Sequence, residues 1–111
     1  MTREVVLVNE VHGADHQHVS ARIDAQGCLV VEGQERGPQV SDFWGDDITE
    51  SEWSWTVARD DLSTLASALK TTLEDLLPTL ARRFSGAALE GLQPFFAAAG
   101  VRVERWSRLG D

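Results

Sequence analysis

Apolar and polar residues alternate over much of the first half of the chain, with the period of two that β-strands require. In residues 17–24, Val19, Ala21 and Ile23 share one face, opposite a face of polar side chains. Residues 4–11 differ because their apolar residues fall on both faces: Val5, Leu7 and Val11 on one, Val6 and Val8 on the other. Such a pattern predicts a strand that is covered on both sides over its middle.

Breaks in this alternation predict the turns. Residues 24–27, Asp-Ala-Gln-Gly, separate the β-rich run 17–24 from a second run at 28–32, which predicts a β-hairpin. Residues 33–37 form a further break. Beyond it, Val40, Phe43 and Trp44 have helical spacing between Pro38 and Gly45, so a short helix is expected at 38–44.

Alternation returns in residues 52–57, where Trp53, Trp55 and Val57 share one face, and it predicts a half-buried strand. The second half of the chain then changes to helical spacing. A helix is expected to begin at Asp60 or Asp61, whose side chain would cap it. Its apolar stripe consists of Leu62, Leu65, Ala66 and Leu69.

Two further apolar stripes have helical spacing. The first follows two overlapping capping-box patterns in residues 71–75 and consists of Leu73, Leu76, Leu77, Leu80 and Phe84. Pro78 must lie in the first turns of this helix or kink it. The second stripe consists of Leu89, Leu92, Phe95, Phe96 and Ala99. Pro94 is expected to bend or restart this helix, Gly100 to follow its end, and residues 101–106 to form a closing strand.

The expected order is therefore β-β-β-(short α)-β-α-α-α-β. It predicts an α+β fold: a mostly antiparallel sheet of four or five strands, with a C-terminal group of two or three helices packed on one face. A length of 111 residues, 42% of them hydrophobic and 25% charged, suits a single globular domain over 1–111.

Nothing in the sequence predicts a membrane or secreted protein. No run approaches the roughly 18–20 apolar residues that cross a bilayer, and the N-terminal apolar run of residues 5–8 is too short for a signal peptide. The single cysteine precludes an internal disulfide. We therefore expect a cytoplasmic protein.

Charge is distributed unevenly along the chain. The formal net charge is −8, and residues 1–61 carry 13 acids against 4 bases, whereas residues 62–111 carry 5 against 6. An acidic surface repels nucleic acid and anionic membrane and attracts basic partners, although net charge also serves solubility alone. One lysine against nine arginines is typical of proteins encoded by GC-rich bacterial genomes.

Candidate catalytic and metal-binding groups are few. His12, His16 and His18 form a cluster in which His16 and His18 would share one face of a strand, a geometry that can bind zinc or nickel. The alternative is a solvated turn between two strands. Cys28 is a candidate nucleophile, but its place in an apolar strand favours a buried, unreactive thiol. We expect no enzyme activity, no cofactor and no metal.

A small basic and aromatic patch lies near the C-terminus, where Trp106 stands among Arg102, Arg105 and Arg108. Such a patch can contact nucleic acid through phosphates and stacking. The acidic balance of the whole chain opposes this, and Trp106 is more simply a core or edge residue. We expect no nucleic-acid binding.

Acids concentrate around aromatic residues in segment 42–61. Aromatic side chains can anchor an interface, and surrounding carboxylates can speed encounter with a basic partner. The alternative is that the aromatic side chains belong to the core and the acids solvate loops and cap helices. The partner-binding residues predicted here are Asp42, Trp44, Asp46, Asp47, Glu50 and Glu52.

Residues 50–57 (Glu-Ser-Glu-Trp-Ser-Trp-Thr-Val), the leucine-striped helices and the ending Arg-Trp-Ser-Arg-Leu-Gly-Asp resemble the small acidic α+β immunity proteins that bacteria use against polymorphic toxins. The resemblance implies tight, stoichiometric occlusion of a toxin's active site or substrate surface. Two alternatives stay open. One is a regulatory or scaffold domain that acts as a homodimer, and the other is a small ligand- or metal-binding protein that uses His12, His16 and His18.

Overall fold

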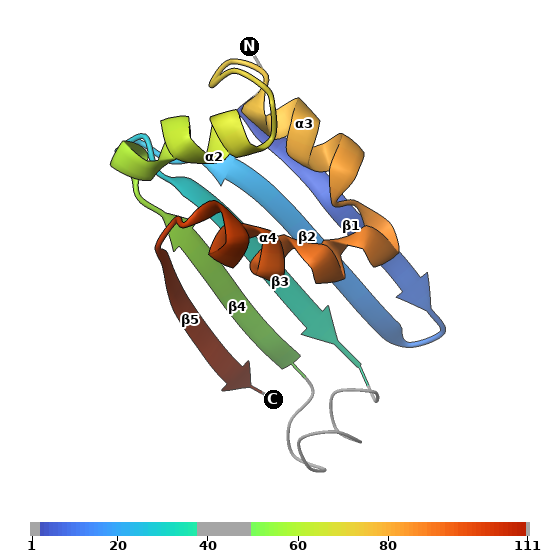
Figure 1. The fold of residues 1–111 in the computed structure, drawn as a ribbon. Coiled ribbons are helices and arrows are strands. Elements are labelled where there is room, and N and C mark those ends of the chain that lie inside the picture. Colours follow the sequence, from blue (N-terminus) through green and yellow to red (C-terminus); the bar gives the residue numbers. More distant parts are fainter. Residues whose placement is uncertain (1–2, 38–49, 111) are drawn as a thin grey trace.

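A computed structural model describes residues 3–37 and 50–110, which form one sheet and a layer of helices (Figure 1). The strands run β1 (Glu4–His12), β2 (Asp15–Ile23), β3 (Leu29–Arg36), β4 (Glu50–Val57) and β5 (Val103–Gly110). The described helices, all between β4 and β5, are α2 (Leu62–Ala68), α3 (Leu76–Arg83) and α4 (Leu92–Ala99), with 3₁₀ segments at Arg59–Asp61 and Gly86–Gly91. The short helix expected at 38–44 lies outside the described residues.

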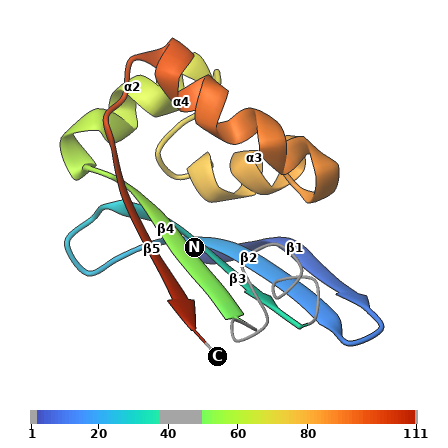
Figure 2. The ribbon, with the colours of Figure 1, turned by 90° about the horizontal axis from the view of Figure 1, so that it is seen from below.

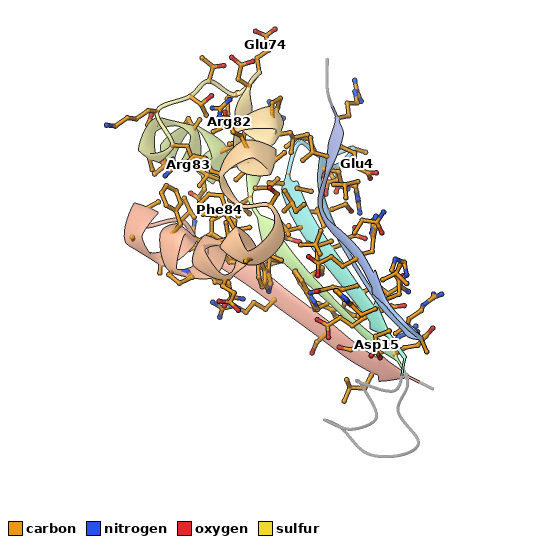
Figure 3. All side chains as sticks on the ribbon, turned by 90° about the vertical axis from the view of Figure 1, so that its right-hand side faces the viewer. Glu4, Asp15, Glu74, Arg82, Arg83 and Phe84 are labelled. Atoms are coloured by element: carbon orange, nitrogen blue, oxygen red, sulfur yellow. The ribbon has the colours of Figure 1, made fainter. Side chains whose placement is uncertain are left out.

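The five strands follow one another in the sheet in chain order, and every neighbouring pair is antiparallel. All three helices pack on one face (Figures 1 and 2). They cover the part of the sheet near Glu4, whereas the end near Asp15 extends beyond them (Figure 3). The predicted α+β fold, with an antiparallel sheet and helices on one face, is confirmed. None of the described helices has the length and apolar character needed to cross a membrane.

The core lies between the helices and the sheet. Its most completely buried side chains are Val19, Leu29, Val31 and Val57 from the strands, and Leu65, Leu76, Leu80, Leu92 and Phe96 from the helical layer. The helical stripes are confirmed except at Leu73, which is 58% exposed. Since α3 begins only at Leu76, Leu73 precedes the helix and does not share its buried face.

β1 departs from the expected alternation because it contains a β-bulge. The register with β2 shifts between Val6 and Val8, so Leu7 and Val8 both turn toward the helices and are buried. Val6 and Val11 are 50% and 66% exposed on the other face. An extra residue in a bulge reverses the alternation that follows it, which explains the apolar residues on both sides. The expectation that both faces of this strand are covered is wrong for the described structure.

β3 continues through Gly33, where the sequence predicts a break. Gly33 pairs with Val19 of β2 and Trp53 of β4, and the Trp53 indole lies over it. A Cβ atom at position 33 would lie 2.0 Å from Cε2 of Trp53. Glycine at this position therefore allows the Trp53 indole to approach the backbone of β3 closely, and it does not end the strand.

The ends of the helices agree with the sequence in some places and differ in others. Pro78 and Pro94 are each the third residue of a helix, and α4 restarts after a 3₁₀ segment as the proline predicts. Gly100 ends α4 in the left-handed conformation, with φ 75°. Asp61 occupies the N-cap position of α2 as expected. It makes no side-chain capping hydrogen bond, because its carboxylate instead accepts a hydrogen bond from the backbone N–H of Arg102, at 3.4 Å.

Candidate functional site

The candidate site is the face of the sheet that no described helix covers, which we call the open face. Alternate residues of all five strands project from it, and the strand register aligns them in rows. The three central rows are Asn9, His18, Gln34, Glu52 and Arg108; then Val6, Ser20, Glu32, Ser54 and Trp106; then Glu4, Arg22, Val30, Thr56 and Glu104. The result is a broad, mainly polar surface with one large aromatic residue.

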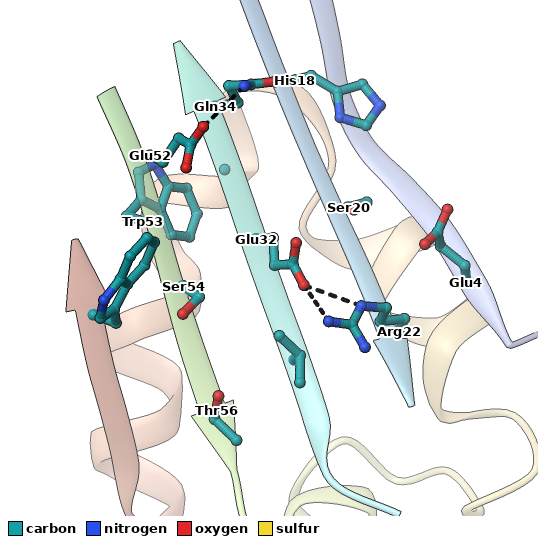
Figure 4. Close-up of a pocket in the computed structure, with 13 residues that line it drawn as sticks. Glu4, His18, Ser20, Arg22, Glu32, Gln34, Glu52, Trp53, Ser54 and Thr56 are labelled. Atoms are coloured by element: carbon teal, nitrogen blue, oxygen red, sulfur yellow. Dashed lines mark hydrogen bonds and ion pairs between the residues drawn. The ribbon is translucent and has the colours of Figure 1, made fainter. Parts of the chain in front are cut away.

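Ion pairs cross this face between neighbouring strands. Glu32 of β3 accepts hydrogen bonds from the Arg22 guanidinium of β2 (Figure 4). Glu52 forms an ion pair with Arg108, with Nη2 at 3.3 Å, and accepts a hydrogen bond from Gln34 Nε2 at 3.2 Å. Nearer the loop end, Glu50 meets Arg36 Nε at 3.2 Å. Each such exposed pair contributes about 0.2–1 kcal/mol to stability, so together they fix side-chain positions more than they hold the fold.

The centre of the open face is hollowed. A shallow cavity of about 710 Å³ is lined by charged and polar side chains that include Glu4, His18, Arg22, Glu32 and Glu52 (Figure 4). Trp106 of β5 borders the cavity and is 53% exposed. Tryptophan is enriched at the centres of protein interfaces because it offers a large apolar area with few rotatable bonds. The hollow therefore combines charge with one exposed anchoring side chain, and the part-buried Trp53 also lines it.

The structure divides the predicted binding residues. Glu50 and Glu52 both lie on the open face, half-buried and already paired with arginines of neighbouring strands. Asp42, Trp44, Asp46 and Asp47 fall in residues 38–49, outside the described residues. Sequence reasoning missed the roles of Arg36 and Arg108, because nothing local to either residue indicates the strand that it faces.

Trp53 and Trp55 lie on the opposite, helix-covered face. Their rings contact each other with centroids 4.3 Å apart, and both pack against the core. The alternative that assigns these two aromatic side chains to the core therefore describes them better than an interface does. The strand carries its acids and its tryptophans on different faces, since Glu52 alternates with Trp53 and Trp55.

The histidines and Cys28 do not converge on one site. The register places His16 and His18 on the open face, with ring centroids 6.4 Å apart, whereas His12 lies on the other face beside Glu10, at 3.5 Å. Within residues 3–37 and 50–110, no group of three His, Cys, Asp or Glu side chains has metal-binding geometry. Cys28 precedes β3 and is half-buried, at the opposite end of β2 from His16.

The basic patch expected near the C-terminus is also divided. Trp106 and Arg108 lie on the open face, but Arg105 points to the other face because it pairs with Trp55. Arg102 precedes the strand and lies near Asp61, with Nε 3.9 Å from Oδ2. These arginines do not line one groove.

A second cavity, of about 800 Å³, lies at the edge of the helical layer. Its apolar lining includes Ile23, Leu62, Leu76 and Leu77, and Arg59 is among the charged residues that line it. It is separate from the open face, and neither Glu50 nor Glu52, the two predicted binding residues that the structure describes, lines it. Comparisons with family models, with curated proteins and with solved structures find no match for this chain.

Proposed function

We propose that this chain is a non-catalytic protein-binding domain, an immunity-type inhibitor that occludes a basic partner protein such as a toxin domain. The partner binds the open face of the sheet. The observation that carries the proposal is the layout of that face: five strands wide, without a described helix over it, and studded with charged side chains around Trp106.

The shape of the face favours a macromolecule over a small ligand. Small-molecule sites are enclosed and mainly apolar, with a few polar groups that fix orientation. Here the hollow is shallow and its lining is mostly polar or charged. Protein interfaces, in contrast, combine a polar rim with a few aromatic or arginine anchors. Trp106, Arg22 and Arg108 supply such anchors.

Charge supports a basic partner. On the open face, Glu4, Glu32, Glu50, Glu52 and Glu104 outnumber Arg22, Arg36 and Arg108 by two. Glu4 and Glu104 are exposed and make no ion pair with any described residue. A basic surface of a nuclease or nucleotide-binding toxin would complement this excess, and the long-range attraction would accelerate encounter.

Binding is also the better account of the polar groups. A general base or nucleophile needs a partner within hydrogen-bond reach that activates it. Three acids of the open face, Glu32, Glu50 and Glu52, instead meet arginines or a glutamine in cross-strand pairs, which are stable donor–acceptor arrangements. We therefore assign these residues to recognition.

The test begins with the protein encoded beside this chain in its genome, co-purified as a one-to-one complex. The variant Glu4→Lys/Glu50→Lys should slow association several-fold at low salt. The effect should fade above 0.1 M salt, where screening acts over about 10 Å. The matched control Glu74→Lys/Glu90→Lys reverses two exposed acids of the helical layer and should leave the rate near that of the wild type. Equal slowing by both variants would place the binding surface elsewhere.

A further inference from the structure

The outer edge of β5 is an unpaired strand edge. β5 pairs with β4 from Glu50↔Gly110 to Val57↔Val103 without a shift in register, and no described strand lies on its other side. Such an edge exposes a row of backbone N–H and C=O groups that can template another strand. The opposite edge, β1, carries a bulge, a feature that discourages edge pairing. The pairing of β5 with β4 contains no bulge.

The side chains of β5 are arranged symmetrically about Trp106. Two places before it stands Glu104, and two places after it stands Arg108, both on the open face. Three places away on either side stand Val103 and Leu109, on the other face. When the strand meets a copy of itself in antiparallel orientation, residues equidistant from Trp106 face each other. Opposite charges and apolar residues are then matched.

We propose that two copies of this chain pair edge to edge through β5, around a two-fold axis at Trp106. Glu104 of each copy faces Arg108 of the other, Val103 faces Leu109, and Arg105 faces Ser107. The two Trp106 side chains meet at the axis. Because the axis is perpendicular to the sheet, both helical layers lie on one face of a continuous sheet of ten strands. The interface is isologous, as closed dimers require.

Charge selects this register over its neighbours. In a continuous antiparallel sheet, opposed residues share a face, so alternative two-fold registers are centred on Arg105 or Ser107. In the register centred on Arg105, the Arg105 side chains of the two copies face each other, and like charges directly opposite are unfavourable. Centring on Ser107 places Trp106 against Arg108 and leaves Glu104 facing Gly110. Among these three registers, the one centred on Trp106 is alone in opposing acid to base.

The side chains involved are available for this pairing. Trp106 is 53% exposed, and Glu104 makes no ion pair with any described residue. Arg108 already meets Glu52 at 3.3 Å, so the dimer would extend this pair into a row of Glu52, Arg108 and Glu104 of the second copy. None of the described helices lies over β5 (Figure 1). The inference is independent of the partner proposed above.

The test exchanges charges at the two-fold axis. In analytical ultracentrifugation, the wild-type protein should sediment as a dimer at protein concentrations within about 1–100 μM, a range that reveals a dimer with a micromolar dissociation constant. Glu104→Lys and Arg108→Glu, each studied alone, replace two attractive cross-strand pairs with two repulsive ones. Each should raise the dimer dissociation constant about tenfold or more. An equimolar mixture of the two variants should form a heterodimer about as tight as wild type, because one cross-strand pair is again Glu104 with Arg108 and the other is attractive with its charges reversed.

The matched controls Glu90→Lys and Arg82→Glu change exposed charges of the helical layer and should leave dimerisation unchanged. Circular dichroism and melting curves should confirm that all variants fold, which is expected for exposed positions. Three outcomes would overturn the proposal: a wild type that stays monomeric at 100 μM, a dimer insensitive to both charge reversals, or a mixture that does not associate. None of these outcomes bears on whether a different protein binds the open face.

Discussion

The indole of Trp53 occupies the space in which a side chain of Gly33 would lie. These two residues are direct partners across β3 and β4, and a Cβ atom at position 33 would approach Trp53 Cε2 to 2.0 Å. The same indole contacts Trp55, with centroids 4.3 Å apart, so it cannot move without disturbing a second ring. An aromatic side chain laid over a glycine of the next strand compensates for the packing that glycine lacks.

Replacing Gly33 by alanine should therefore destabilise the protein by about 1–3 kcal/mol, the range of overpacking substitutions. Urea denaturation of Gly33→Ala, Trp53→Val and the double variant measures the coupling. The double variant should lose clearly less than the sum of the single losses, because the smaller valine frees the space that alanine needs. Additive losses would show that the two residues do not compete for this space.

This contact also explains why the sequence predicts β3 incompletely. Taken locally, Gly33 and Gly37 are strand breakers, and only a residue twenty positions later shows that Gly33 belongs to the sheet. β1 presents the same difficulty, because the bulge after Val6 is specified by pairing with β2 and not by composition. The sequence predicts the helices more accurately than the strands, since the apolar stripe of a helix depends only on spacing within one segment.

The candidate site is less predictable from sequence than the fold. Glu50 and Glu52 can be identified as members of an acidic segment, but their partners Arg36 and Arg108 become visible only once the register of three strands is known. Likewise, alternation predicts that Trp53 and Trp55 share a face, yet it cannot state which face the helices cover. Long-range pairing, and not local preference, assigns charge and aromatic residues to opposite sides of β4.

The ends of α2 and α4 have the same hydrogen-bond pattern but different residues at the left-handed position. Lys70 has φ 57° and its N–H bonds to Ser67 O, while Gly100 has φ 75° and its N–H bonds to Ala97 O. A left-handed conformation costs a non-glycine residue about 1–2 kcal/mol. The difference predicts that exchanging the residue type at the two positions changes stability in opposite directions.

Lys70→Gly should stabilise the protein by about 0.5–1 kcal/mol, after allowance for the greater chain entropy of glycine. Gly100→Ala should destabilise it by about 1 kcal/mol. No neighbouring atom lies within 4 Å of a Cβ at position 100, so that loss reports backbone strain alone. Thermal melting of both variants checks the pair, and changes of the same sign would contradict the assignment.

The boundary of α3 can be tested with two leucines that the sequence assigns to one stripe. Leu76 is 1% exposed within the core, whereas Leu73 is 58% exposed before the helix. Leu76→Ala should cost about 2–5 kcal/mol, and Leu73→Ala should change stability by less than about 0.5 kcal/mol. Chemical denaturation of the two variants measures both values. Similar losses of stability for the two variants would show that Leu73 is buried with Leu76, as its spacing predicts.

The central claim is that a partner protein binds the open face, and Ser54 lies near the middle of that face on the lining of its hollow. Ser54→Arg places a long charged side chain there without touching the core. Ser63→Arg makes the same change at an exposed position of α2. The decisive measurement is the dissociation constant of each variant for the co-purified partner. Ser54→Arg should weaken binding at least about thirtyfold, the loss that accompanies one strong interface contact, with Ser63→Arg near wild type. Full affinity of Ser54→Arg would contradict the account.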